Sequence, residues 1–172
     1  MKNTRSIGIR AAALSLALGV LAGCATTTPF GKGVLERVDR SVTPAQVVST
    51  PGALQGREVL WGGQIISSRN LNNGTELTVL AYPLDSRGRP DTDQAAQGRF
   101  IALQAGYLET ADYAPNRQIT IYGQVSGVRQ AQVGEASYPY PVVQIQQIHL
   151  WPTASTYRYP PVHFGVGVGI GL

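Results

Sequence analysis

The sequence predicts an all-β protein: a small five-stranded barrel with one short connecting helix, placed after a signal peptide and a tether. Three observations predict this class. The 172 residues include 20 glycines and 11 prolines, a composition that favours turns and short strands over long helices. Five runs with strand-like patterning lie between Val59 and Trp151. The pair Gly62-Gly63 interrupts the first run, as at a bulge or sharp coil of a closing sheet.

The first 23 residues have the layout of a secretory signal. Three basic residues precede an apolar run over 11–21, and the small residues Ala22 and Gly23 follow it. This order of charged, apolar and small residues is typical of a signal peptide. The run is too short for a membrane span, which needs about 20 residues. We therefore expect residues 1–23 to be removed by cleavage between Gly23 and Cys24.

The stretch Leu21-Ala22-Gly23-Cys24 resembles the lipobox of bacterial lipoproteins. In those proteins the cysteine thiol takes a diacylglycerol and, after cleavage, the new amine is acylated. The resemblance implies a covalent diacylglycerol and N-acyl lipid on Cys24, with no other cofactor. By similarity to sorted lipoproteins, Ala25 rather than aspartate favours the outer membrane. The alternatives are a signal peptide with a chance cysteine and an uncleaved anchor.

Charge and cysteine content restrict the partners of the mature chain. Removing 23 of the 172 residues leaves 149, enough for one domain with a sizeable core. Three of the 14 basic residues lie in the signal and none of the 10 acidic ones does, so the mature chain is nearly neutral. This balance argues against a nucleic-acid partner. Cys24 is the single cysteine, so a disulfide within one chain is excluded.

Residues 24–42 are interpreted as the lipidated N-terminus and tether, in which 34–39 could form a helical turn or an added edge strand. A barrel domain is expected over 43–152. It opens with a short helix at Thr43-Pro44, because threonine caps the first amides and proline is tolerated at the first helical position. Two strands then follow, joined by a hairpin turn at 72–74, where the sequence is Asn-Asn-Gly.

The remaining strands are separated by two polar segments, predicted as loops over 84–98 and 128–141. One helical turn is expected over 108–114. The apolar register of the last strand slips, which predicts a bulge near Gln146-Gln147. A five-stranded barrel of the OB type fits this order best, with an open antiparallel sheet or a small sandwich as competitors. The expected core residues are Trp61, Ile65, Val79, Phe100, Ile121 and Ile145.

Residues 153–172 form a tail rich in proline and glycine. Glycine alternates with apolar residues from Gly165 to Leu172. In an extended chain these apolar side chains would share one face. An edge strand that docks on the barrel or a partner, and a frayed terminus, are both open interpretations.

An ordered set of short motifs runs through the predicted barrel. They are Gly56–Ile65, Tyr82–Asp85, Gly88–Pro90, Gly98–Phe100, Gly106–Leu108, Tyr113–Arg117, Tyr138–Pro141 and Leu150-Trp151. Behind a lipobox, this set resembles the Slp family of outer-membrane lipoproteins, which is linked to starvation in enteric bacteria. The resemblance covers residues 24–152. It implies a lipid-anchored protein at the periplasmic face of the outer membrane and supplies no catalytic residue.

Residues for catalysis or metal binding are scarce. The two histidines, His149 and His163, lie in the last strand and the tail. Without a second cysteine they make a poor metal site. Asp91-Thr92-Asp93 lacks the glycine and distal glutamate of a calcium loop. A nucleophile elbow and a phosphate-binding glycine loop are also missing. We therefore expect no enzyme, no catalytic residue and no metal.

The function expected is a structural or protein-binding role in the cell envelope, and the family resemblance suggests a link to stress. The alternative is a periplasmic ligand-binding barrel for a small molecule or a cell-wall glycan. Recognition usually falls to loops on a rigid scaffold, with arginine and aromatic anchors. The candidate partner-binding residues are accordingly Arg87 and Arg89 in the first loop and Tyr138 and Tyr140 in the second. In the competing interpretation both loops are solvated spacers.

Overall fold

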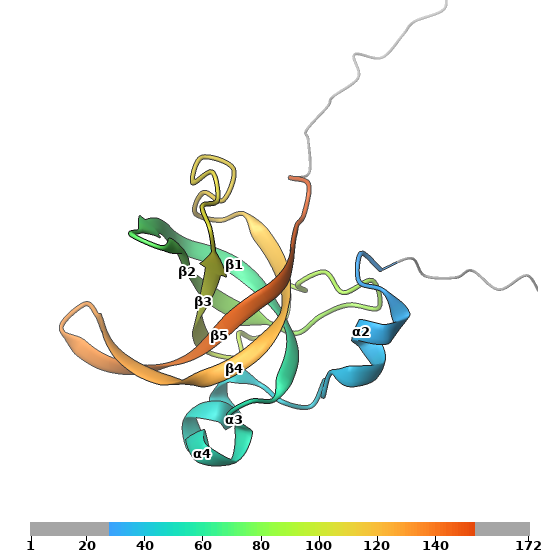
Figure 1. Ribbon diagram of the computed structural model, residues 1–172, viewed down its shortest axis with the longest axis horizontal. Helices are drawn as coiled ribbons and strands as arrows, with labels where there is room; N and C mark the ends of the chain where they lie inside the picture. Colours follow the sequence, from blue (N-terminus) through green and yellow to red (C-terminus); the bar gives the residue numbers. More distant parts are fainter. Residues whose placement is uncertain (1–27, 154–172) are drawn as a thin grey trace, which may run out of the picture.

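The chain folds into a closed barrel (Figure 1). The structure, a computed structural model, describes residues 28–153. The strands are β1 (Glu58–Leu71), β2 (Gly74–Tyr82), β3 (Arg99–Ala105), β4 (Gln118–Val133) and β5 (Ala136–Leu150). Their order around the barrel is β1-β2-β3-β5-β4, with β3 and β5 parallel and the other pairs antiparallel. This is the connectivity of an OB-type barrel, so the open sheet and the sandwich are excluded.

Side chains from all five strands fill the barrel. Val59, Trp61 and Ile65 of β1 point inward, as do the alternate residues of the other strands. The predicted core is confirmed for Trp61, Ile65, Val79, Phe100 and Ile121, which are at most 5% exposed. Ile145 is only half-buried and packs against this core from the side.

Two glycines allow the strands to coil tightly enough to close. A Cβ atom at Gly63 would lie 1.9 Å from the carbonyl oxygen of Leu80, and one at Gly123 would lie 2.2 Å from that of Gln144. Any side chain there would push neighbouring backbones apart. The predicted sharp coil is therefore present at the glycine pair. A bulge follows it, because the register with β2 shifts between Ile65 and Ser67.

The slip in the last strand is a bulge at the predicted place. Tyr122 pairs with Gln147 and Gly123 pairs with Ile145, which leaves Gln146 as the extra residue of β5. Because side chains alternate between the faces of a strand, one extra residue exchanges the faces. This explains why the apolar residues on either side of Gln146 follow opposite phases.

The N-terminal segment differs from the predicted tether. From residue 28 the chain packs on the barrel, and α2 (Lys32–Arg37) lies over the outer faces of β1 and β4. Phe30, Val34 and Val38 are spaced four residues apart and are buried together with Leu60 and Tyr122. Apolar residues at this spacing share one side of a helical segment. The tether interpretation is thus wrong from residue 28 onward.

Asp39 fixes the end of this segment. Its carboxylate accepts hydrogen bonds from the hydroxyl and backbone N–H of Ser41, at 2.6 and 3.0 Å, and pairs with Arg57 at 3.1 Å. These bonds to the charged form lower the pKa of Asp39, with the Ser41 hydroxyl as the largest cause.

Two short helices close one end of the barrel. α3 (Pro44–Ser49) begins with the predicted cap: the N–H of Gln46 donates to the Thr43 hydroxyl, and the Gln46 side chain accepts from the N–H of Thr43. α4 (Pro51–Leu54) follows at once. Val47 of α3 is fully buried in the main core.

Between β3 and β4 the chain makes the single turn expected over 108–114. The N–H of Tyr113 donates to the carbonyl of Glu109 at 3.1 Å, and strand β4 begins five residues later. The short helices of the described chain therefore precede the barrel rather than cross between its strands.

The second predicted loop is wrong, because its residues form strand. β4 continues to Val133 and β5 starts at Ala136, so residues 127–141 make a long two-stranded projection, here called the hairpin arm. Pro139 and Pro141 are accommodated because they lie two residues apart. Both can turn their ring nitrogens away from β4, where no ladder hydrogen bond is lost. Residues 154–172, with the Gly-alternating tail and His163, lie outside the described residues.

Candidate functional site

The hairpin arm curls over the outside of the barrel. Its alternate residues Ala131, Val133, Tyr138 and Tyr140 pack with Ile101, Leu103 and Val142 on the outer faces of β3 and β5. Tyr138 and Tyr140 meet edge to face, with ring centroids 4.9 Å apart. This small outer core holds the arm in place above the sheet. Figure 1 shows the arm reaching away from the barrel at the side opposite α2.

A groove of about 480 Å³ lies between the arm and the β1–β2 hairpin. We call it the hairpin groove. Its floor is formed by outward-facing residues of β1, β2 and β3, and its wall is formed by four consecutive residues of β4. The lining residues are Ser67, Arg69, Glu76, Thr78, Ile101, Arg129, Gln130, Ala131, Gln132 and Tyr140. Its volume is within the range of ordinary ligand sites.

A buried carboxylate joins the floor to the wall of the groove. The Glu76 side chain is 5% exposed and lies between two arginines, Arg69 of β1 and Arg129 of the arm. Arg69 Nη2 lies 2.8 Å from Oε1, and Arg129 pairs with Oε2. The arginine side chains are 64% and 42% exposed. The cluster therefore carries a net positive charge, with guanidinium groups accessible from the groove.

The wall of the groove is an open strand edge. From Gly127 to Val133, β4 pairs with β5 alone within residues 28–153. Pro139 and Pro141 lie opposite Gln130 and Val128. Since a proline cannot donate to the ladder, these are positions whose backbone groups point away from the partner strand. The N–H and C=O of Gln130 therefore face the groove rather than β5.

The structure does not bring the four predicted partner-binding residues together. Arg89 contacts Gln118 at the start of β4, and Arg87 lies on the same loop. Tyr138 and Tyr140 lie in the arm, where they pair with the last part of β4. Tyr140 lines the hairpin groove but is 4% exposed, and Tyr138 is half-buried. The tyrosines thus support the site by packing. Cys24 and Gly23 lie outside the described residues.

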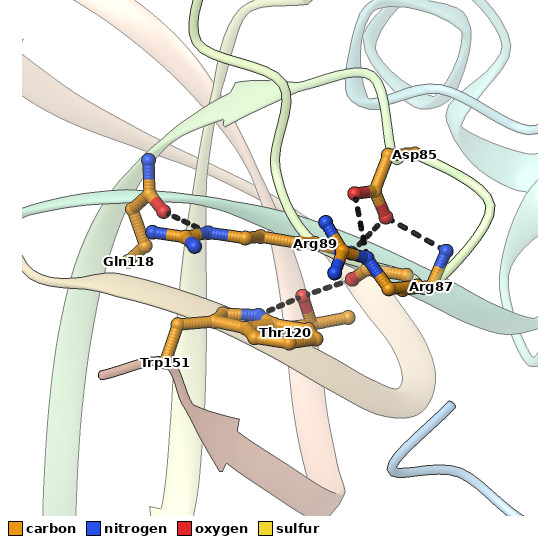
Figure 2. Close-up of polar contacts among 7 residues, drawn as sticks. Asp85, Arg87, Arg89, Gln118, Thr120 and Trp151 are labelled. Atoms are coloured by element: carbon orange, nitrogen blue, oxygen red, sulfur yellow. Dashed lines mark hydrogen bonds and ion pairs between the residues drawn. The ribbon is translucent and has the colours of Figure 1, made fainter. Parts of the chain in front are cut away.

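Arg87 and Arg89 belong to a loop that is pinned to the barrel (Figure 2). The Asp85 carboxylate accepts the backbone N–H groups of both residues, at 2.8 and 2.9 Å. The Thr120 hydroxyl donates to the carbonyl of Gly88 at 2.6 Å. The loop between β2 and β3 is therefore held against the barrel by hydrogen bonds and is not a solvated spacer.

The Arg89 side chain binds to residues of the barrel. Its Nε donates to Gln118 at 2.7 Å, and its guanidinium lies 5.9 Å from the ring centre of Trp151. The Trp151 indole in turn donates to Thr120 at 2.9 Å, as Figure 2 shows. Arg87 is 64% exposed and is the freer of the two arginines.

Sequence reasoning missed Arg69, Glu76 and Arg129. A usable signal existed for the first two. They flank the predicted Asn-Asn-Gly turn at nearly equal distances, and in the observed register they face each other directly. Arg129 offers no such signal, because the sequence predicts a loop over 128–141.

The histidine within the described residues takes part in packing. His149 packs edge to face on Trp151, with ring centroids 4.4 Å apart. Within residues 28–153, no three histidine, cysteine, aspartate or glutamate side chains gather closely enough to hold a metal ion. In the same part of the chain, no helix is long and apolar enough to cross a membrane.

The fold defines a class, the small OB-type barrel domains, and a cysteine behind a signal-like leader is typical of exported, lipid-anchored proteins. Comparison with known families gives the particular group. Residues 21–166 match the profile described as the outer membrane lipoprotein Slp family. The chain belongs to this family, which locates it at the outer membrane and implies a membrane anchor.

The chain is also similar in sequence to three individual proteins. An uncharacterized protein of Haemophilus influenzae is 34% identical over 105 residues, which cover 60% of this chain and 57% of that protein. The uncharacterized lipoprotein YeaY of Escherichia coli is 29% identical over 83% of this chain and 72% of its own length. Outer membrane protein Slp of Escherichia coli is 30% identical over 81% and 73%.

Solved structures match only loosely. A small single-stranded DNA-binding protein from Streptomyces coelicolor aligns with a TM-score of 0.35 and 15% identity, covering 55% of this chain and 94% of that one. The Pot1pC domain of Schizosaccharomyces pombe, bound to single-stranded DNA, gives 0.29 and 10%, covering 69% and 88%. Matches this weak carry no argument about binding.

Proposed function

We propose that the protein is a lipid-anchored binding protein of the envelope: a lipid on Cys24 holds it at the periplasmic face of the outer membrane, and the hairpin groove takes an extended segment of another envelope protein. The observation that carries this proposal is the open edge of β4 facing the groove. An unpaired edge is a template for strand addition, in which main-chain hydrogen bonds give affinity and pockets for alternate side chains give specificity.

The two edges of the arm support this use. The β5 edge carries Pro139 and Pro141, which remove two outward N–H groups and so discourage pairing. The β4 edge has no proline over 127–133 and is the edge that borders the groove. An edge left open beside a groove, while its neighbour is blocked, is the arrangement expected of a binding edge.

The charges beside the open edge favour an acidic segment. Arg69 and Arg129 share the single carboxylate of Glu76, and both remain partly exposed. An aspartate or glutamate side chain of an added strand would meet these guanidinium groups within the groove. Figure 1 places the arm and α2 at opposite ends of the molecule, so an anchor near α2 would leave the groove directed away from the membrane.

Proline substitution at the open edge tests the proposal. Gln130→Pro removes the N–H that faces the groove and leaves the ladder to β5, whereas Gln130→Ala keeps that N–H. A photoreactive residue at exposed Gln132 reports binding in living cells. We expect protein crosslinks with Gln130→Ala, and about tenfold fewer with Gln130→Pro, since losing one main-chain hydrogen bond removes roughly 1.4 kcal/mol.

The same experiment separates the alternatives. Unchanged protein crosslinks in a folded Gln130→Pro variant would rule out strand addition. Crosslinks to cell-wall glycan instead of protein would favour the ligand-binding interpretation, for which the face between these two hairpins is the usual site in OB-type barrels. A photoreactive residue at Arg87, on the pinned loop, is the positional control and should give few crosslinks.

A further inference from the structure

A second hollow lies at the start of the described chain. It is a cavity of about 230 Å³ between the N-terminal segment, β1 and the loop after β2, here called the N-terminal cavity. Leu35, Leu60, Trp61 and Leu84 supply apolar walls, and Thr28 lies among the lining residues. Polar side chains also line the cavity: Arg40, Thr43, Asp85, Ser86 and Gln97. It shares no lining residue with the hairpin groove.

The cavity is close to the predicted lipid in the covalent chain. Three residues separate Cys24 from Thr28. A fully extended chain advances at most about 3.6 Å per residue, so the Cys24 backbone lies within about 14 Å of the Thr28 backbone. A chain attached to the Cys24 thiol can therefore reach the cavity without unfolding any described element.

We propose that the N-terminal cavity holds part of one acyl chain carried by Cys24 when the protein is in water. The inference rests on the lipidation of Cys24 in the proposed function and goes beyond it. The volume has room for roughly eight groups of the size of a methylene or a water, at about 30 Å³ each. It therefore accommodates a segment of one chain and not a whole diacylglycerol.

Attachment favours this chain over other amphiphiles. A ligand on a short linker has an effective concentration in the millimolar range, so a shallow and partly apolar site suffices to hold it. Seating one chain would shield part of the lipid while the protein crosses the aqueous space between two membranes. In a bilayer the chain would return to the lipid, because the bilayer buries the whole chain whereas the cavity buries only a segment of it.

The single cysteine of the chain makes the test direct. The chain from Cys24 to Leu172 is alkylated at Cys24 with an octyl group that ends in a nitroxide, which quenches tryptophan at close range. A Trp151→Phe background leaves Trp61, in the cavity wall, as the reporter. We expect roughly half or more of the Trp61 emission to be lost, independently of protein concentration.

Cavity-filling variants provide the control. Leu35→Phe and Leu84→Phe each enlarge a half-buried wall residue and should restore the emission while circular dichroism stays that of the folded barrel. The proposal would be overturned if the parent protein showed no quenching. It would also be overturned if the folded Leu35→Phe and Leu84→Phe variants were quenched as strongly as the parent.

A further experiment identifies the source of the acyl chain that the cavity binds. If free nitroxide-labelled octanoate quenches the unalkylated protein but the attached chain does not, the cavity takes lipid from the surroundings and the proposal is wrong. The mass of Cys24 in protein from cells tests the anchor itself, so failure of the anchor and failure of the cavity are distinguishable.

Discussion

Ile121 is a suitable residue for measuring how the core stabilises the barrel. It is fully buried in β4, opposite Trp61 of β1 and Ile148 of β5. Its truncation would leave a void that the closed sheet cannot collapse around.

We predict that Ile121→Ala lowers the free energy of unfolding by about 2–5 kcal/mol in urea titrations. Gln132→Ala, on the exposed part of the same strand, should change it by less than about 0.5 kcal/mol. A loss of similar, small size for both variants would show that β4 does not direct Ile121 into the core.

Single residues also show where sequence reasoning reaches its limit. The burial of Trp61 and Phe100 followed from strand alternation, which is local information. The pairing of Glu76 with Arg129 joins residues on β2 and the arm, and it depends on how the arm curls over the barrel. No local pattern encodes that curl, so the centre of the groove became visible only in three dimensions.

At the scale of elements, the glycine coil, the cap at Thr43 and the bulge at Gln146 were all predictable, because each depends on neighbouring residues. For α2 the sequence predicts only a possible helical turn over 34–39, and it does not predict the arm. Gly31 and Gly33 concealed the four-residue spacing of Phe30, Val34 and Val38, and the Tyr-Pro-Tyr-Pro run resembled a loop. Proline is a reliable sign of a break only where both sides of a strand are paired.

The blocked edge of the arm leads to a prediction about self-association. Replacing Pro139 and Pro141 together by valine restores two outward N–H groups and raises strand propensity on an exposed edge. We expect the soluble mature chain to form dimers or larger species in analytical ultracentrifugation, with circular dichroism unchanged.

Ser137→Val is the matched control for that experiment, since it raises strand propensity on β5 without adding an N–H group. The Ser137→Val variant should remain monomeric at every protein concentration at which the parent is monomeric. Association of the control alone, or of neither protein, would mean that the prolines do not protect this edge.

For the whole molecule, family membership implies a membrane anchor, and the lipobox-like stretch predicts that Cys24 carries it. We predict that Cys24→Ala accumulates as a precursor that keeps residues 1–23 and is missing from the outer-membrane fraction. Two or more acyl chains are needed for stable anchoring, since each buried methylene contributes about 0.8 kcal/mol.

Intact-mass measurement of the purified protein decides this prediction. The parent and a Thr26→Ala control should both begin at a modified Cys24. An unmodified thiol at Cys24 in the parent would refute the anchor, whatever the fractionation shows.

The parallel pairing of β3 with β5 also determines the order of events when the barrel assembles. The β1–β2 and β4–β5 pairs are hairpins of neighbouring strands, whereas β1–β4 and β3–β5 join distant parts of the chain. The β1–β4 seam comprises seven residue pairs, and the β3–β5 seam only three, from Ile101–Val142 to Leu103–Gln144. Hairpins form within microseconds, but a contact between distant parts of the chain must first overcome the entropy of closing a long loop. The barrel is therefore expected to close last along β3 and β5 and, once folded, to open there first. Backbone amides of this seam should then exchange their hydrogens with solvent through local opening before those of the other strand pairs.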